Sequence, residues 1–165
     1  MAELAAWIMD FGNGHRAATG IRTLVHLVPA PVLADVPRAP VHCRRVLVWN
    51  RQLLPAWDVG AFLGSPALAS DRAIAGIAAY HVGAEARLGA LLLREPPLRA
   101  SVVEPQDCEL PDPRWAAIAA ACFMHDGQAL PVLDLRRIFA SPIEGSLPSA
   151  PDEFDVIGDN ALAAA

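Results

Sequence analysis

Apolar positions along this chain fall in short runs separated by turn residues, and one such pattern occurs twice. The first copy covers residues 51–63 and the second covers residues 127–139, 76 positions later. The copies share these aligned pairs: Gln52 with Gln128, Leu54 with Leu130, Pro55 with Pro131, and Asp58 with Asp134. Self-similarity at a fixed spacing indicates a duplicated structural unit, so the pattern predicts two related lobes.

The apolar runs are mostly short enough to be strands, and turn residues stand between them. Residues 7–11 alternate, Gly12-Asn13-Gly14 tolerate positive φ, and the chain can return after them, which predicts a hairpin over residues 7–18. Asn50-Arg51 and Asp126-Gly127 hold the same place in the two copies, each between apolar runs. The same reading predicts further strands at residues 45–49, 52–57, 74–80 and 87–93.

Prolines decide the conformation of the segment between the first two hairpins. Residues 28–40 contain four of them, so this segment is expected to be extended, either wrapped over the surface or placed at a sheet edge. The run before it, from Ile21 to Val28, fits one face of a helix or an irregular strand, and its periodicity does not choose between them.

These elements predict a mainly β protein made of two small β-barrels packed together, with short helical turns. The lobes are expected at about residues 20–65 and 74–140, with the N-terminal hairpin 7–18 completing the barrels. Asp58 and Asp134 each precede a short apolar turn, where a carboxylate can accept hydrogen bonds from free amides, so both are predicted to be structural caps. Residues 141–165 are rich in Ser, Pro and acids and are predicted to be a flexible acidic tail.

Composition narrows the range of partners and compartments. Hydrophobic residues make up 54% of the chain and charged residues 19%, but no apolar run approaches the roughly 20 residues that span a bilayer, so direct membrane insertion is not expected. A net charge of -5 gives no basic surface for nucleic acid. The N-terminus lacks the features of a secretory signal, and three widely spaced cysteines fit reduced thiols, which together predict a cytoplasmic protein.

A search for reactive motifs predicts no catalytic site and no cofactor. The best metal candidate joins His42 and Cys43 with Cys122 and His125, a set with zinc-type ligands. His42 and Cys43 are neighbours that would point to opposite faces of a strand, so the structural interpretation is preferred and no metal is predicted. Trp49 stays a candidate interface residue because it adjoins Arg51, and Trp and Arg are enriched in interface hot spots.

The order of motifs over residues 7–139 resembles the CheW-like domain family of bacterial chemotaxis and type IV pilus signalling. The resemblance rests on three runs in sequence order: Val36-Pro37-Arg38-Ala39-Pro40, the Asn50-Arg51 turn, and Leu54-Pro55-Ala56-Trp57-Asp58-Val59. In the second half, Arg87 to Leu93 is similar to the family's Val-Gly-Leu-Leu-Val strand, and Leu130 to Leu135 to its closing Leu-Asp-Leu segment.

This resemblance implies two five-stranded SH3-like barrels and a non-catalytic adaptor of two-component signalling. Such adaptors couple the cytoplasmic tip of a chemoreceptor to the regulatory domain of a CheA-type histidine kinase. An apolar edge of one barrel would pack against the kinase, and the groove between the barrels would take the receptor's helical hairpin.

The chain departs from the family pattern at two places that matter for binding. Asn50-Arg51 stands where the family has Arg-Gly, and His26, followed by Leu27, stands where the family has an acid. The residues expected to bind partners are therefore Trp49, Asn50, Arg51, His26 and Leu27, and the changes favour a divergent partner set such as a pilus-type pathway.

Two other functions are weighed against the adaptor. One is a β-barrel that binds a small ligand or a metal, with a groove lined by Trp49 or Trp57 or a site using Cys122 and His125. The other, an enzyme that uses Asp58 and Asp134 as acid and base, is disfavoured because the two carboxylates occupy equivalent capping places in a repeat.

Overall fold

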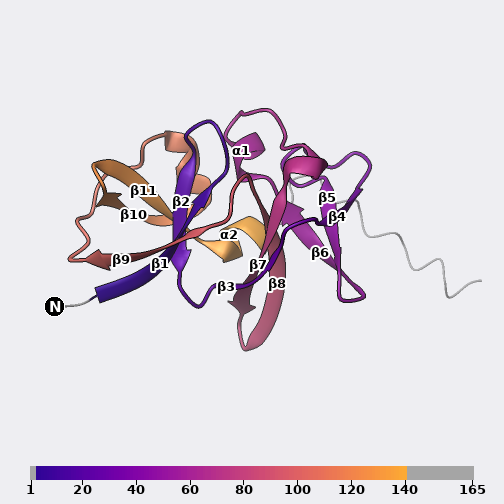
Figure 1. Cartoon of the computed structure of the whole chain (residues 1–165), viewed down its shortest axis with the longest axis horizontal. Coiled ribbons are helices and arrows are strands. Elements are labelled where there is room, and N and C mark those ends of the chain that lie inside the picture. The colour runs from indigo at the N-terminus through magenta and orange to yellow at the C-terminus, as the bar shows by residue number, and fades with distance from the viewer. Residues whose placement is uncertain (1–2, 141–165) are drawn as a thin grey trace, which may run out of the picture.

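The computed structural model describes residues 3–140, and the tail expected over residues 141–165 lies outside them. The described chain is mainly β, with short helical turns at four places (Figure 1). The strands are β1 (Glu3–Asp10), β2 (Arg16–Gly20), β3 (Leu24–Val28), β4 (Val32–Asp35), β5 (Arg45–Trp49), β6 (Gln52–Trp57), β7 (Ile74–Val82), β8 (Glu85–Leu93), β9 (Leu98–Val103), β10 (Ala119–His125) and β11 (Gln128–Leu133). The helical turns are α1 (Val59–Phe62), α2 (Leu135–Phe139) and two 3-10 turns at Ser70–Arg72 and Pro113–Ala117.

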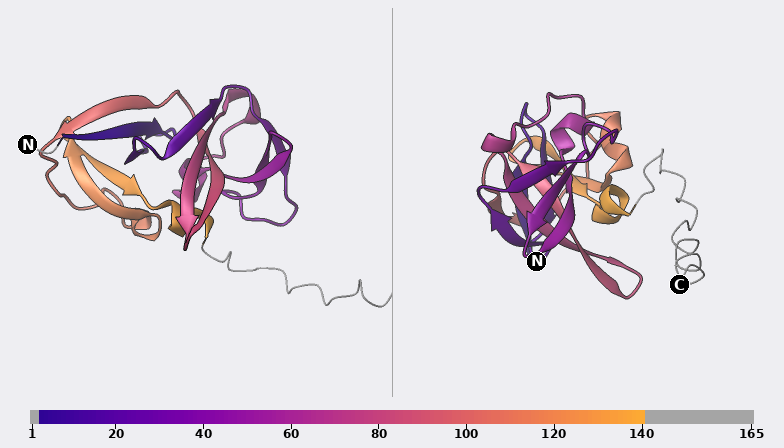
Figure 2. Two further views of the ribbon diagram at one scale, coloured as in Figure 1. Left: turned by 90° about the horizontal axis from the view of Figure 1, so that it is seen from below. Right: turned by 90° about the vertical axis from the view of Figure 1, so that its right-hand side faces the viewer.

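The strands form two sheets that lie toward opposite ends of the long axis (Figures 1 and 2). One sheet has five strands in the order β10-β11-β2-β1-β9, and the other has six in the order β3-β7-β8-β6-β5-β4. The predicted mainly β architecture of two small packed units is therefore present.

The N-terminal hairpin expected over residues 7–18 is β1 paired with β2. Its turn contains Gly12 and Gly14 at φ 91 and 77, which suits residues without a Cβ. The run that the sequence left open between helix and strand is the strand β3, which pairs with β7 at the edge of the six-stranded sheet. A register shift between Leu24 and His26 marks an irregularity of the bulge type in β3.

The proline-rich segment supplies the strand that makes the second sheet six-stranded rather than five-stranded. Residues Val32–Asp35 lie between prolines and pair antiparallel with β5, as the sheet-edge alternative predicted. A proline-flanked strand belongs at an edge because missing amide donors would interrupt a central ladder. The chain thus runs directly from one edge strand, β3, to the other, β4.

Sheet membership divides the chain differently from the lobes expected at residues 20–65 and 74–140. β7 and β8 pair with β3 and β6, so residues 74–93 join the six-stranded sheet. The N-terminal hairpin instead joins the five-stranded sheet, where β1 pairs with β9 and β2 with β11. The two halves of the sequence are therefore interleaved in space.

Away from its exposed tip, the β7–β8 hairpin is buried on both faces, and this part forms a wall between the two barrels. Ile77 and Leu92 pack into the core of the six-stranded barrel. Ala78, Leu91 and Leu93 point the other way, into a central cluster shared with the five-stranded sheet and both α turns. That central cluster includes Met9, Phe11, Val59, Leu63, Trp115, Ile118, Leu133, Leu135 and Ile138.

The five-stranded barrel has its own core and is closed by a short segment after β9. Its core contains Ile8, Val102, Phe123 and Leu130, together with Ala6 and Ala18. Asp107 forms a bridge with Phe123 of β10. Residues 106–108 therefore join the free edge of β10 to the end of β9, which covers an edge that would otherwise be open to another chain.

Candidate partner-binding surface

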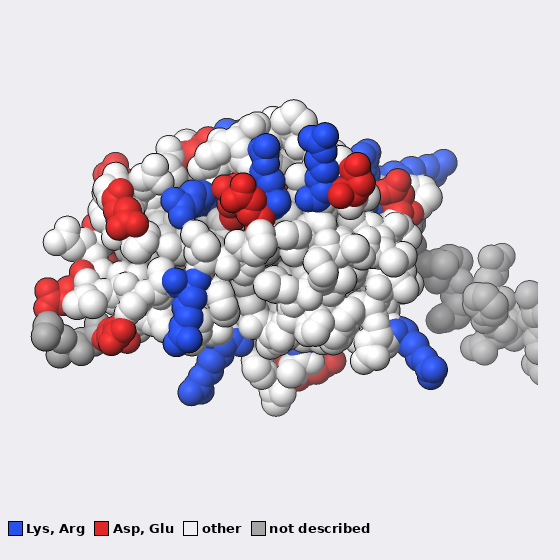
Figure 3. Space-filling view, viewed as in Figure 1, with Lys and Arg blue, Asp and Glu red and all other residues white. Residues whose placement is uncertain are grey.

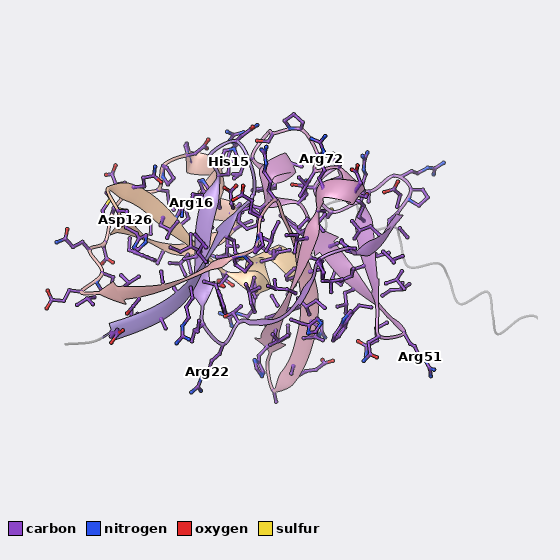
Figure 4. The ribbon with its side chains drawn as sticks, viewed as in Figure 1. His15, Arg16, Arg22, Arg51, Arg72 and Asp126 are labelled. Atoms are coloured by element: carbon purple, nitrogen blue, oxygen red, sulfur yellow. The ribbon has the colours of Figure 1, made fainter. Side chains whose placement is uncertain are left out.

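The turn between β5 and β6 places Arg51 at an exposed tip of the molecule. Trp49 pairs with Gln52, so Asn50 and Arg51 form a two-residue hairpin loop. Their φ angles are 48 and 60, which is the left-handed geometry of a type I′ turn. Arg51 points away from the body of the protein (Figure 4).

Directly behind this tip, three large apolar side chains form a row on the outer face of the sheet. Val32 of β4 lies opposite Val48 of β5, and Val48 lies opposite Leu53 of β6. Their exposed fractions are 65%, 43% and 67%. We call these three residues the apolar row. Contiguous exposed apolar groups on a soluble protein mark interaction sites, so the row extends the candidate surface beyond the turn.

His26 and Trp49 come from strands far apart in the sheet order, yet their rings meet. The ring centroids are 5.6 Å apart with the planes tilted by 43°. Leu27 is 40% exposed on the same edge strand. The structure therefore brings His26 to Trp49, and Trp49 adjoins Asn50 and Arg51 in sequence.

Sequence reasoning missed the apolar row, although a signal for it was present. A strand with one buried face should alternate, but Val46-Leu47-Val48 and Leu53-Leu54 are apolar on both faces. Leu47 and Leu54 are buried, which leaves their neighbours Val48 and Leu53 facing solvent. Apolar residues on both faces of β5 and β6, the two strands nearest the edge strand β4, are the pattern that identifies this surface.

A shallow groove of about 350 Å³ runs between the two barrels. Thr23, Ala79, Tyr80 and His81 line it from the side of the six-stranded sheet. The opposite wall comes from β10, β11 and α2, and contains Ala120, Leu133, Asp134, Leu135 and Arg136. On the face drawn in Figure 3, charged side chains lie mainly along the margins, and the centre, over β3, β7 and β8, is largely uncharged.

The carboxylate of Asp58 is the N-cap of α1 and also the partner of a buried arginine. One of its oxygens accepts a 2.9 Å hydrogen bond from the amide of Ala61, and the other accepts 2.8 Å from the amide of Leu68. Arg45 Nη2 lies 3.3 Å from the same carboxylate, and the side chains are only 6% and 3% exposed. The capping role of Asp58 was predicted from the sequence, but its pairing with Arg45 was not. Arg45 is the first residue of an apolar strand, and nothing in that run indicates that its side chain points inward.

Asp134 caps α2 in a more open setting. Its carboxylate accepts hydrogen bonds from the amides of Arg136 and Arg137 at 3.0 and 3.3 Å. Both carboxylates therefore accept hydrogen bonds from backbone amides and lie beside arginines, as the capping role predicted.

The residues of the candidate metal set are engaged in other contacts. His42 packs against the rings of Trp57 and Phe62, with centroids 4.6 and 5.2 Å away. Burial lowers the pKa of His42, partly opposed by the charge of Asp58. His125 Nε2 lies 3.3 Å from the carboxylate of Asp126. Within residues 3–140, no group of three or more His, Cys, Asp and Glu side chains is placed to hold a metal ion.

An apolar cavity of about 300 Å³ lies in the five-stranded barrel. Its wall includes Ala18, Val102, Phe123 and Val132, and Thr19 is also among the lining residues. Thr19 Oγ1 is buried and has no hydrogen-bond partner in the described part of the chain. Cys122 contributes to this wall, whereas His125 does not belong to its lining.

Comparisons with known proteins give a match in structure and none in sequence. A scan against protein-family models finds no matching family, and a search of curated proteins finds no match. The fold is similar to that of the scaffolding protein TtCheW from Thermoanaerobacter tengcongensis, with a TM-score of 0.65 and 11% sequence identity. The match covers 82% of this chain and 86% of that chain.

None of the helices in the described residues has the length and apolar character needed to cross a membrane.

The similarity to TtCheW extends over both barrels and agrees with the family that the motif order indicated. The chain therefore has the CheW-like fold, as the resemblance in sequence predicted.

Proposed function

We propose that this protein is a non-catalytic adaptor that couples a chemoreceptor to a CheA-type histidine kinase in chemotaxis or pilus-motility signalling. The observation that carries the proposal is the CheW-like fold with an exposed apolar row beside an exposed arginine turn. A sheet face of this kind suits another protein better than a small substrate, because it offers contiguous apolar area without a deep pocket.

The apolar row and the turn form the first part of the proposed interface. Val32, Val48 and Leu53 supply apolar area, and Arg51 supplies a charged group that can pair with a carboxylate at the rim. Trp49 lies on the opposite face of β5 from Val48, packs against the core of the six-stranded barrel and contacts His26, so it supports the turn from behind. This side of the six-stranded barrel is assigned to the kinase regulatory domain.

The groove between the barrels forms the second part and is assigned to the receptor. Its floor and walls come from β7, α2 and the adjoining ends of β10 and β11. An amphipathic helical hairpin would lay an apolar face into such a groove, with charged residues of the partner near Arg136.

Binding of purified full chain to the isolated kinase regulatory domain, measured by titration calorimetry, tests the first assignment. Arg51→Glu and Leu53→Glu should each weaken binding by about tenfold or more, because they reverse the rim charge or bury a carboxylate in the apolar row. Arg72→Glu is the matched control, since Arg72 is also exposed but lies away from Arg51 (Figure 4). Equal affinities for all four proteins, or no binding to kinase and receptor alike, would overturn the proposal.

The apolar cavity of the five-stranded barrel favours one alternative, a protein that binds a small apolar ligand. Thr19 is one of the residues that line this 300 Å³ space, and its buried hydroxyl has no hydrogen-bond partner in the described residues. Native mass spectrometry of protein purified from its host separates the two functions. A stoichiometric small molecule that is lost with Thr19→Val would favour the ligand-binding protein.

A further inference from the structure

Two cysteines that are distant in the sequence lie in contact at the closure of the five-stranded barrel. Cys108 follows β9, Cys122 lies in β10, and their Sγ atoms are 3.2 Å apart. Both are free thiols, Cys122 buried and Cys108 half-buried. The third cysteine, Cys43, stands just before β5 of the other barrel and takes no part in this contact.

The backbone register places the two cysteines directly opposite each other. The amide of Cys108 donates to the carbonyl of Cys122 at 3.2 Å, and the amide of Met124 donates to the carbonyl of Gln106 at 2.9 Å. These bonds flank the Asp107–Phe123 bridge, as in an antiparallel ladder. Opposed residues of the hydrogen-bonded kind have Cα atoms about 5.5 Å apart, which is within the range that a disulfide can bridge.

We propose that Cys108 and Cys122 are an oxidation site, at which a reversible disulfide staples residues 106–108 to β10. The oxidant is hydrogen peroxide. The Cys108 sulfur attacks the peroxide oxygen, the O–O bond breaks, and Cys108 becomes a sulfenic acid as water leaves. The Cys122 sulfur then attacks the Cys108 sulfur, the S–O bond breaks, and the hydroxide leaves with the Cys122 proton as a second water.

Burial sets the order of these steps. Desolvation, with a hydrogen bond to Cys108, raises the pKa of the Cys122 thiol to about 12, so Cys122 stays protonated at neutral pH. Cys108 is the more accessible sulfur and therefore meets the peroxide first. A dithiol reductant reverses the reaction by attacking the disulfide.

The staple acts on the part of the barrel that has the least regular structure. Residues 104–112 connect β9 to a 3-10 turn, and only a few backbone hydrogen bonds tie them to β10. Pro105 and Asp107 of this segment also line the apolar cavity. A disulfide at Cys108 would hold that side of the cavity in place and restrict the opening of the barrel edge.

Oxidation of the purified full chain with hydrogen peroxide tests the site. Thiol titration of the denatured protein should fall from three groups to one, and the intact mass should fall by two hydrogens. The melting temperature should rise by about 6–12 °C, because the cross-link restricts the unfolded chain, and dithiothreitol should reverse all three changes.

Cys43→Ser is the matched control: it should show the same loss of two hydrogens and the same rise in melting temperature, with its titratable thiols falling from two to none. Cys108→Ser, at a half-buried position, and Cys122→Ala should each remove the loss of two hydrogens and the gain in melting temperature. Three titratable thiols after full oxidation of a glutathione standard would overturn the proposal. A peptide map that assigns the disulfide to Cys43 or to two different chains would overturn it equally.

Discussion

The two copies of the Pro-x-x-Asp motif have the same local geometry but different surroundings. In both, the Asp amide bonds to a carbonyl 16 residues earlier, at His42 and at Ile118, with a distance of 2.8 Å. Asp58 is 2% exposed and is bound to Arg45, whereas Asp134 is half-buried and its arginines face solvent. Both copies therefore have the same cap. The burial of each cap decides how much it contributes to stability.

The helical turns that follow the caps show the same difference. Gly60 of α1 is buried, and a Cβ there would lie 2.6 Å from the carbonyl oxygen of Phe11. The equivalent residue of α2 is Arg136, which is exposed. Both turns reach the central cluster, but only the second also borders the groove.

The largest expected effect comes from removing the two caps in turn. Asp58→Ala should lower the free energy of unfolding by about 3–5 kcal/mol, because it leaves Arg45 buried without its charge partner. Asp134→Ala removes two amide contacts at a partly exposed site and should cost about 1 kcal/mol. Urea unfolding followed by tryptophan fluorescence measures both. Equal losses would show that burial does not distinguish the copies.

Substitutions at the two hairpin tips should have smaller effects on stability, and the effects should be opposite in sign at the two tips. Arg51 and Gly127 occupy equivalent left-handed positions, at φ 60 and 75. Arg51→Gly should raise the free energy of unfolding by about 0.5–1 kcal/mol, since relief of the backbone strain exceeds the added chain entropy. Gly127→Ala should lower it by about 1 kcal/mol.

Measuring both stability and kinase binding of the Arg51→Gly variant separates the effect of backbone strain from a role of Arg51 in binding. If Arg51 contacts the kinase domain, this variant should be more stable and yet bind more weakly, a combination that a purely structural residue would not give. Greater stability with unchanged affinity would remove Arg51 from the interface.

The smallest expected effect concerns pH, because His42 stands where the second copy has Ile118. Burial lowers the pKa of His42 below its usual value of 6.5, so the unfolded chain takes up this proton more readily than the folded one. Stability from this group is complete above about pH 7 and is lost as the pH falls through 6.5 toward the folded pKa. The nearby charge of Asp58 reduces the size of the loss.

His42→Ile, which copies the second repeat, should flatten that part of the pH profile. The measurement is the difference in urea midpoint between the variant and the unaltered chain at pH 8 and pH 5.5, so that the other four histidines cancel. An identical difference at both pH values would contradict the prediction.

Much of the fold could be read from local patterns, and the remainder depended on long-range pairing. Turn residues located the hairpins around Asn13, Asn50 and Asp126, because few residues tolerate positive φ. The interleaving of the two halves was not visible, since β7 carries apolar residues on both faces and such a strand fits either sheet. The motif order, rather than periodicity, indicated the CheW-like fold.

The candidate site was predicted less completely than the fold. The turn and Trp49 followed from their place in the repeat, and whether they bind a partner stays a prediction. Arg45 and the apolar row could not be assigned, because the direction in which the side chains of a strand face depends on what packs behind it. Leu47 and Val48 are adjacent apolar residues, and only the packing of the barrel shows which one faces solvent.

The β7–β8 hairpin has a consequence for how the molecule unfolds. Its two faces belong to different cores, so neither barrel can lose its structure without exposing apolar surface of the other. A chain that reads as a duplication should therefore melt in a single cooperative transition. A partner bound at either end would stabilise the whole molecule, and a distortion of one sheet would alter the packing of the other.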